Sequence, residues 1–195
     1  MSIKSASQIR RENLNGLVLA GGYSIRMGKD KGLLMYSGLP QREFLFKLLE
    51  TFCTHVYTSC RKDQHLSEKL NPIPDRFQIA GPMNGIMSAF SHHPDASWLI
   101  VAVDMPYVTK ATLQLLTSKR DQTKIATCFY NPETKQPEPL LTLWEKEAYP
   151  YLCAFTKAGK ISPRDFLKIH PVNLIQPPDE KTLLNFNTPE DLLGI

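Results

Sequence analysis

Short apolar runs alternate along this chain with segments in which apolar residues recur every three or four positions. This alternation is typical of α/β proteins, in which buried strands and covering helices follow one another. The first run, from Gly16 to Ala20, predicts a buried strand that ends at Gly21 and Gly22. The most strand-like run covers residues 98–103. Its unbroken apolar character favours burial on both faces, as in a central parallel strand.

The rest of the pattern predicts further strands and the helices that connect them. Strands are expected at residues 55–58, 124–130 and 140–144. Helices are expected at residues 43–52, 64–70, 85–91, 110–118, 145–156 and 162–168. Thr109 is placed to cap the helix that follows it. A final helix is expected to open at residues 187–191, with Thr188 as its cap and Pro189 at its first position.

These elements predict an α/β fold: a single-domain, Rossmann-like three-layer sandwich with a mostly parallel sheet. The proline-rich second half follows without a linker, so it is expected to build onto the same sheet. The first 13 residues are polar and basic, and we expect residues 1–13 to form a flexible extension. Residues 14–195 then form one domain.

Composition excludes several classes of protein. The chain has 195 residues, of which 42% are hydrophobic and 22% charged, so it is too apolar to be disordered. The longest apolar run is far shorter than the ~20 residues that cross a bilayer, and no secretory signal begins the chain. We therefore expect a cytoplasmic protein without a membrane partner. The net charge of +4 is spread without long basic blocks, so no nucleic-acid partner is expected. The four cysteines form no metal-binding spacing and are predicted to be free thiols.

A glycine-rich segment with three cations follows the first predicted strand. It reads LAGGYSIRMGKDK over residues 19–31 and includes Arg26, Lys29 and Lys31. Glycines let backbone N–H groups approach an anion closely, so a nucleoside triphosphate is a natural ligand. The spacing matches neither a Walker loop nor a dinucleotide-binding fingerprint. The alternative interpretation is an ordinary turn between strand and helix with solvated basic residues.

Asp104 follows the predicted central strand, at the edge of the sheet where an open α/β fold binds its ligand. A carboxylate beside phosphates would repel them unless a cation lay between. Mg²⁺ suits this position because it commonly takes one or two carboxylates together with phosphate oxygens. The alternative is an aspartate that caps the turn before Pro106.

Four segments, in order, resemble the molybdenum cofactor guanylyltransferase family. The glycine-rich segment matches every fixed position of the pattern LAGGxSxRMGxDK. Residues 81–86 (GPMNGI) are similar to the family's GPLAGI segment, and residues 103–107 (VDMPY) to its C-D-x-P-Y strand end. Residues 185–191 (NFNTPED) are similar to its closing N-x-N-T-P-E-E. The resemblance implies a fold of the nucleotide-diphospho-sugar transferase type, with residues 14–195 as the nucleotidyltransferase domain.

The resemblance also implies a set of site residues. The catalytic residues would be Arg26, Lys31 and Asp104, and the metal ligands of Mg²⁺ would be Asp104 and Asn187. The GTP-binding residues would be Leu19, Ala20, Gly21, Gly22, Lys31, Ser59, Asp75 and Asp104. Ser59 stands where the family has an asparagine, and no role is assigned to Tyr23.

Two of these implied residues have a chemical rationale and a simpler alternative. Asp75 is similar to the family aspartate that contacts guanine, whose ring N–H and exocyclic amine a carboxylate can accept together. Its alternative is a surface turn aspartate. Asn187 would complete the metal shell or hold a phosphate, and its alternative is a turn asparagine before the Thr188 cap.

The implied reaction transfers GMP from GTP to molybdopterin and releases pyrophosphate. It needs no protein nucleophile, because positioning and charge neutralisation suffice. The implied partners are GTP, molybdopterin and, transiently, proteins that insert molybdenum or receive the product. The alternatives are a cytidylyltransferase or sugar-phosphate nucleotidyltransferase, or a nucleotide-binding module without turnover. The pair Gly21 and Gly22 argues against the cytidylyl branch, which usually carries LAAG.

Overall fold

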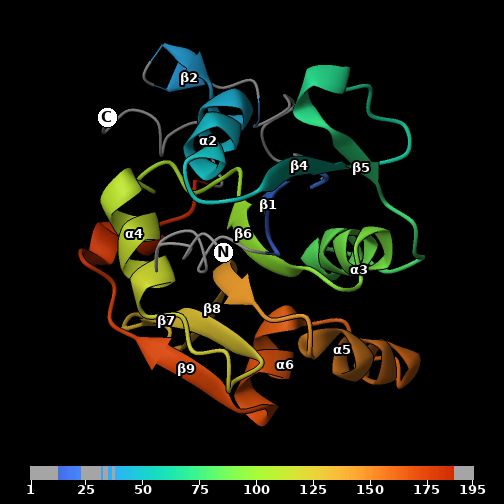
Figure 1. Cartoon of the computed structure of the whole chain (residues 1–195), viewed down its shortest axis with the longest axis vertical. Coiled ribbons are helices and arrows are strands. Elements are labelled where there is room, and N and C mark those ends of the chain that lie inside the picture. Colours follow the sequence, from blue (N-terminus) through green and yellow to red (C-terminus); the bar gives the residue numbers. More distant parts are fainter. Residues whose placement is uncertain (1–12, 23–31, 33–34, 37, 187–195) are drawn as a thin grey trace, which may run out of the picture.

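The computed structural model of the chain describes residues 13–22, 32, 35–36 and 38–186. Its centre is a seven-stranded sheet with the order β5-β4-β1-β6-β8-β7-β9 (Figure 1). The strands are β1 (Leu14–Leu19), β4 (His55–Cys60), β5 (Pro72–Pro74), β6 (Ser97–Ala102), β7 (Ala126–Asn131), β8 (Gln136–Trp144) and β9 (Val172–Ile175). A separate two-stranded sheet pairs β2 (Met35–Tyr36) with β3 (Leu39–Pro40).

The sheet is mostly parallel, as the sequence predicts. Strand β1 lies between β4 and β6 and pairs with both in parallel. Strand β8 runs antiparallel to its neighbours β6 and β7, and β9 pairs with β7 in parallel. The carboxyl ends of β4, β1 and β6 therefore lie side by side at one edge of the sheet.

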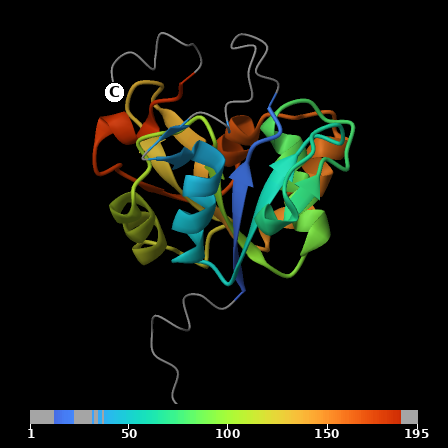
Figure 2. The same cartoon turned by 90° about the horizontal axis from the view of Figure 1, so that it is seen from above.

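Helices cover both faces of the sheet, which confirms the three-layer prediction. Helices α2 (Gln41–Glu50) and α4 (Lys110–Ser118) lie on one face. Helices α3 (Pro82–His92), α5 (Ala148–Lys157) and α6 (Pro163–Ile169) lie on the other (Figures 1 and 2). Strands β1 and β6 are buried along their whole length between these layers. The apolar runs that predict the two strands are thus the centre of the core.

Local sequence features explain two of these elements. The Thr109 hydroxyl accepts a hydrogen bond from the backbone N–H of Thr112, so Thr109 caps α4 as predicted. The Thr112 hydroxyl also accepts a bond from the N–H of Thr109, which makes the cap reciprocal. Gly16 lets α2 approach β1, because a Cβ atom there would lie 3.1 Å from the Cβ of Leu49. A larger residue at position 16 would push the helix layer away from the sheet.

The sequence predictions fail at the margins of the fold. The helix expected at residues 64–70 is wrong, because the chain forms only the 3₁₀ turn η2 (Glu68–Leu70), which starts at a Ser67 cap and ends at Asn71 with φ 45°. Strands β5 and β9 and the 3₁₀ turn η3 (Glu180–Leu183) are not predicted, and β8 begins four residues before the expected 140. The prolines of β5 are tolerated because this strand lies at the edge of the sheet.

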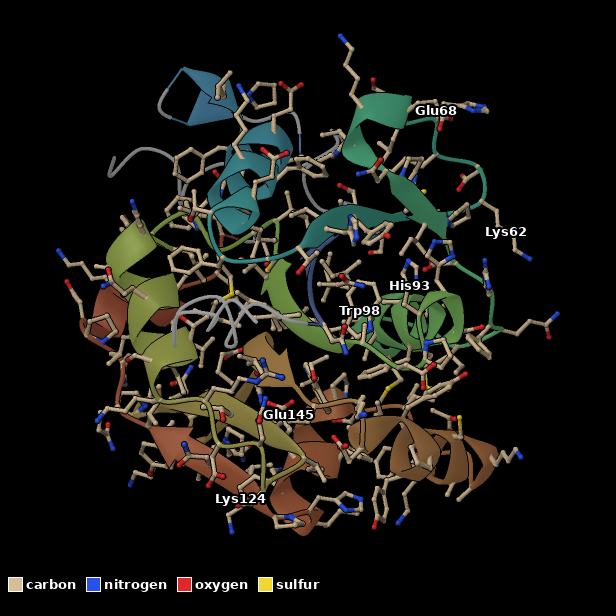
Figure 3. The ribbon with its side chains drawn as sticks, in the orientation of Figure 1. Lys62, Glu68, His93, Trp98, Lys124 and Glu145 are labelled. Atoms are coloured by element: carbon tan, nitrogen blue, oxygen red, sulfur yellow. The ribbon has the colours of Figure 1, made fainter. Side chains whose placement is uncertain are left out.

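A buried ion pair joins three elements at the opposite edge of the sheet from the carboxyl ends of β1 and β6. The Arg120 guanidinium donates to both carboxylate oxygens of Glu145, over 2.7 Å and 2.6 Å. The Ser97 hydroxyl donates to Glu145 over 2.7 Å and accepts from Arg120 over 2.9 Å. Figure 3 shows Glu145 and Trp98 in the interior.

Three further expectations concern the whole chain. Residues 1–12 of the extension expected at residues 1–13, and the final helix expected at residues 187–191, lie outside the described residues. The cysteines are free thiols, as predicted, and three of them are buried. Over the described part of the chain, no helix combines the length and the apolar character that a membrane span requires.

Candidate functional site

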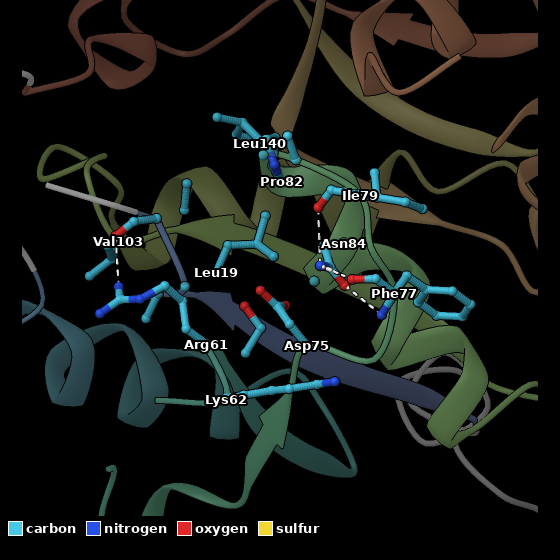
Figure 4. A pocket seen from close by; sticks show the side chains of 18 of the residues that line it. Leu19, Arg61, Lys62, Asp75, Phe77, Ile79, Pro82, Asn84, Val103 and Leu140 are labelled. Atoms are coloured by element: carbon cyan, nitrogen blue, oxygen red, sulfur yellow. Dashed lines mark hydrogen bonds between the residues drawn. The ribbon is translucent and has the colours of Figure 1, made fainter. Parts of the chain in front are cut away.

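A pocket of about 810 Å³ opens at the carboxyl ends of β1, β4 and β6 (Figure 4). This is the position at which open α/β sheets bind ligands. The pocket brings together seven of the residues that the sequence singles out. They are Leu19, Ala20, Gly21, Gly22, Ser59, Asp75 and Asp104.

The remaining predicted site residues, Arg26, Lys31 and Asn187, lie outside the described residues. The last described residue, Phe186, nevertheless contacts the backbone of a pocket residue. The backbone N–H of Phe186 donates to the carbonyl oxygen of Asp104 over 2.9 Å. The residue that precedes Asn187 is therefore hydrogen-bonded to the backbone of a pocket residue.

The floor of the pocket is held by backbone hydrogen bonds that continue the parallel ladder. The N–H of Ala20 donates to the carbonyl of Ser59 over 3.3 Å, and the N–H of Val103 donates to that of Leu19 over 3.1 Å. The N–H of Asp75 donates to the carbonyl of Cys60 over 2.8 Å. Residues far apart in sequence thus occupy fixed places around one cavity.

The two glycines after β1 differ in their surroundings. A Cβ atom on Gly21 would lie 3.5 Å from the Oδ2 atom of Asp75, which is ordinary contact. A Cβ atom on Gly22 would have no described atom within 4 Å. Packing against the described residues does not require glycine at position 22, so the absence of a side chain there leaves room for a ligand to approach the backbone.

Asp75 has an unusual electrostatic environment. Partial burial raises the pKa of its carboxyl group from 3.8 to about 6, although the nearby charges of Arg61 and Lys62 act in the opposite direction. The carboxylate faces the pocket (Figure 4). The charged form therefore lacks full solvation in the free protein, and a ligand with N–H donors would stabilise it.

Asp104 lies near a second carboxyl group, that of Glu138 on β8. Burial raises the pKa of Glu138, its Arg164 neighbour and the backbone N–H of Leu140 lower it, and the charge of Asp104 raises it further. The Leu140 bond to Glu138 is 3.0 Å long, and the closest Arg164 nitrogen lies 3.6 Å away. Among the described residues, no group of three or more acidic, histidine or cysteine side chains could hold a metal ion.

The wall opposite the glycine turn is built by α3 and the segment before it. Gly81 adopts a positive φ of 77°, which favours glycine, and Pro82 starts the helix. A Cβ atom on Gly85 would lie 2.8 Å from Leu19 and 2.9 Å from the Ser59 hydroxyl. The glycine at position 85 thus allows α3 to rest directly on the pocket floor.

Arg61 and Lys62 also line the pocket, although they belong to none of the sequence motifs. The Arg61 guanidinium donates to the carbonyl of Gly22 over 3.3 Å (Figure 4). It also donates to the carboxylate of Asp63 over 3.1 Å. Arg61 therefore ties the loop after β4 to the glycine turn after β1. Two cations directly after a predicted strand were the available sequence signal.

A mostly parallel sheet with a glycine turn, acidic residues and cations at its carboxyl edge defines a nucleotide-binding α/β protein of the nucleotide-diphospho-sugar transferase fold. The sequence model of the MobA-like NTP transferase domain matches residues 16–174. The chain belongs to this family.

Similar proteins with known names support the assignment to this family. A molybdenum cofactor biosynthesis bifunctional protein from Synechocystis sp. is 36% identical over 95% of this chain, which spans only 54% of that protein's length. A probable molybdenum cofactor guanylyltransferase from Trichormus variabilis is 30% identical, over 94% of this chain and 90% of the relative. The crystal structure of molybdopterin-guanine dinucleotide biosynthesis protein A from Archaeoglobus fulgidus superposes with a TM-score of 0.75 and 25% identity, over 92% of this chain and 95% of the other.

Proposed function

We propose that this protein transfers GMP from GTP to molybdopterin, forming molybdopterin guanine dinucleotide and releasing pyrophosphate. The observation that carries the proposal is the convergence of seven residues in one pocket. The family resemblance implies eight GTP-binding residues, and all of these except Lys31, which lies outside the described residues, line that pocket. The names of the family relatives support the same activity.

Guanine is the base that the pocket suits best. Asp75 presents a carboxylate that accepts two adjacent N–H groups, and guanine offers its ring N–H and its exocyclic amine side by side. Cytosine and uracil do not offer this pair of donors. Phe77 and Ile79 supply apolar surface beside Asp75 for the base itself.

The polar groups at the other end of the pocket fit a magnesium ion. Asp104 supplies a carboxylate oxygen at the pocket wall, and Asn187 would add an amide oxygen. A single carboxylate is sufficient for Mg²⁺ when phosphate oxygens complete its shell, which agrees with the lack of a larger metal-binding cluster among the described residues. When bound, the ion would neutralise charge on the triphosphate.

The reaction is a displacement at phosphorus. The terminal phosphate oxygen of molybdopterin forms a bond to the α-phosphorus of GTP, while the bond to the bridging oxygen breaks and pyrophosphate leaves. The glycine turn holds the triphosphate, and Arg26 and Lys31 balance the negative charge that develops on it. The protein contributes position and charge rather than a nucleophile.

A nucleotide panel tests the proposal. Because a ligand stabilises the folded state by mass action, GTP with Mg²⁺ should raise the melting temperature more than ATP, CTP or UTP do. Pyrophosphate release with GTP and molybdopterin should then follow, and it separates an enzyme from a nucleotide-binding module. Equal shifts for all four nucleotides would contradict guanine selectivity, and CTP as the preferred substrate would indicate the cytidylyl alternative.

A further inference from the structure

The segment of residues 75–81 forms the side of the pocket next to Asp75, yet it contains no helix or strand. Its shape is therefore not set by a ladder of backbone hydrogen bonds of its own. Six of its seven residues line the pocket: Asp75 and the run from Phe77 to Gly81. Something outside the segment must hold it in place.

The side chain of Asn84, in the first turn of α3, makes three hydrogen bonds to this segment (Figure 4). Its Oδ1 atom accepts from the backbone N–H of Phe77 over 3.2 Å. Its Nδ2 atom donates to the carbonyl oxygens of Phe77, over 2.6 Å, and Ile79, over 3.1 Å. One amide group thus fixes both backbone groups of Phe77 and turns the chain at Ile79.

Ser88, one turn further along α3, completes the arrangement. Its hydroxyl accepts from the backbone N–H of Arg76 over 2.9 Å and donates to Oδ1 of Asn84 over 3.3 Å. Asn84 is only 7% exposed and Ser88 is fully buried. Asn84 lines the pocket next to the segment that it holds, whereas the fully buried Ser88 is not one of the lining residues.

Asn84 also stands beside Gly85, the residue through which α3 rests on Leu19 and Ser59. The first turn of α3 therefore connects the pocket floor, through Gly85, with the segment next to Asp75, through Asn84. The backbone around Asp75 is held on its other side by the bond from its N–H to Cys60. The carboxylate that would bind guanine therefore belongs to a residue whose backbone is held by Cys60 on one side and by the bonds of Asn84 on the other.

We infer that Asn84 is a positioning residue for guanine selectivity. Its amide holds residues 77–79 so that the base is presented to Asp75 with both N–H groups in register. This inference rests on the proposed function. It adds a residue that acts through the backbone of residues 77–79 rather than through a bond to the base. The donors of Asn84 matter most, because they hold the two carbonyl groups.

Selectivity is measured as the ratio of kcat/KM for GTP to that for ITP, which lacks only the exocyclic amine. In Asn84→Ala we expect this ratio to fall about tenfold, the effect of misaligning one hydrogen bond, while kcat at saturating GTP is retained. In the absence of nucleotide, hydrogen exchange at the backbone amide of Phe77 should be faster in this variant than in the wild type. Ser88→Ala should move both readouts in the same direction by a smaller amount.

Asn84→Asp separates wall positioning from a role in starting the helix. An aspartate in the first turn favours the helix, but its carboxylate cannot donate to the carbonyls of Phe77 and Ile79. We expect the ratio of kcat/KM for GTP to that for ITP to be as low in N84D as in N84A, or lower. N84D with wild-type selectivity would overturn the inference, because the donors would then be dispensable.

Asn173→Ala is the matched control. It removes another bond from an asparagine amide to a backbone carbonyl, that of Lys119, over 2.8 Å, far from the pocket. Selectivity should be unchanged in this variant. A wild-type protein that does not turn over GTP with molybdopterin would overturn the proposed function. A wild-type protein that turns over GTP without preferring it to ITP, or whose preference survives in N84A, would overturn the inference alone.

Discussion

Burial of Asp75 disfavours its charged form in the free protein, and the same carboxylate would bind guanine in the complex. Its partial burial disfavours the charged carboxylate and raises its pKa to about 6, although Arg61 and Lys62 oppose this shift. Two N–H donors from a guanine base would supply the solvation that burial removes. Binding of the base should therefore favour the ionised form and release a proton wherever the free carboxyl is still protonated.

This coupling predicts the direction of the pH dependence. Since only ionised Asp75 accepts both guanine N–H groups, the affinity for GTP should rise as the pH increases through about 6. Calorimetric titrations from about pH 5 to about pH 8 would measure it. The terminal phosphate of GTP also titrates in this range, so the Asp75→Asn variant supplies the baseline.

Asp75→Asn should bind GTP more weakly above the transition, and the pH-dependent difference between it and the wild type should vanish at low pH. In the variant the side chain still offers one acceptor oxygen, but its NH₂ group faces the base donors. Parallel curves for the two proteins across the whole range would show that Asp75 does not contact the base.

Helix α3 transmits the position of the sheet to the pocket wall. Gly85 is the point of contact, since a Cβ atom there would lie 2.8 Å from Leu19 and 3.1 Å from the Cβ of Ser59. Both neighbours belong to the pocket floor. A shift of α3 would therefore move the floor and the wall relative to each other.

Substitution of two glycines should separate packing from ligand approach. Gly85→Ala overpacks the contact between helix and sheet and should lower the free energy of unfolding by about 1–3 kcal/mol. Gly22→Ala adds a Cβ where no described atom lies within 4 Å, so its stability should stay close to wild type while its GTP affinity falls. Urea denaturation and GTP titration of both variants would measure the two effects. Unchanged GTP affinity in Gly22→Ala would show that no ligand atom approaches this turn.

The elements at the centre of the fold could be predicted from the sequence, and those at its margins could not. Strands β1 and β6 are buried on both faces, so unbroken apolar runs make up most of their sequences. Strands β5 and β9 lie at the two ends of the sheet, where backbone pairing with one neighbour suffices and the side chains carry little pattern. The apparent helix at residues 64–70 is ended by local bonds of Ser67 and the left-handed Asn71.

The candidate site divides in the same way. Residues at the ends of predicted strands, such as Gly21 and Asp104, could be placed because parallel strands end at one edge of the sheet. Asn84 could not, because its three backbone partners belong to a segment without periodicity. Arg61 contacts the carbonyl of Gly22, 39 residues away in sequence, and such a contact requires the folded chain.

The buried ion pair between Arg120 and Glu145 lies away from the pocket. Ser97, a partner of Arg120 and Glu145, begins β6, and Asp104 follows the end of the same strand. A strand of this length spans about 20 Å, at about 3.3 Å per residue. Arg120 and Glu145 are almost fully buried, with exposed side-chain fractions of 7% and 3%.

Removal of Arg120 should therefore destabilise the whole fold without altering recognition. In Arg120→Ala, Glu145 stays buried without its charged partner, which typically costs about 3–5 kcal/mol. Thermal and urea denaturation should show this loss, whereas the KM for GTP, measured well below the melting temperature, should match the wild type. Lys168→Ala is the control, because it breaks an exposed ion pair with Asp165 and should change neither quantity appreciably. A raised KM in Arg120→Ala would mean that the two ends of β6 are coupled, and that the sheet does not hold the pocket independently of this pair.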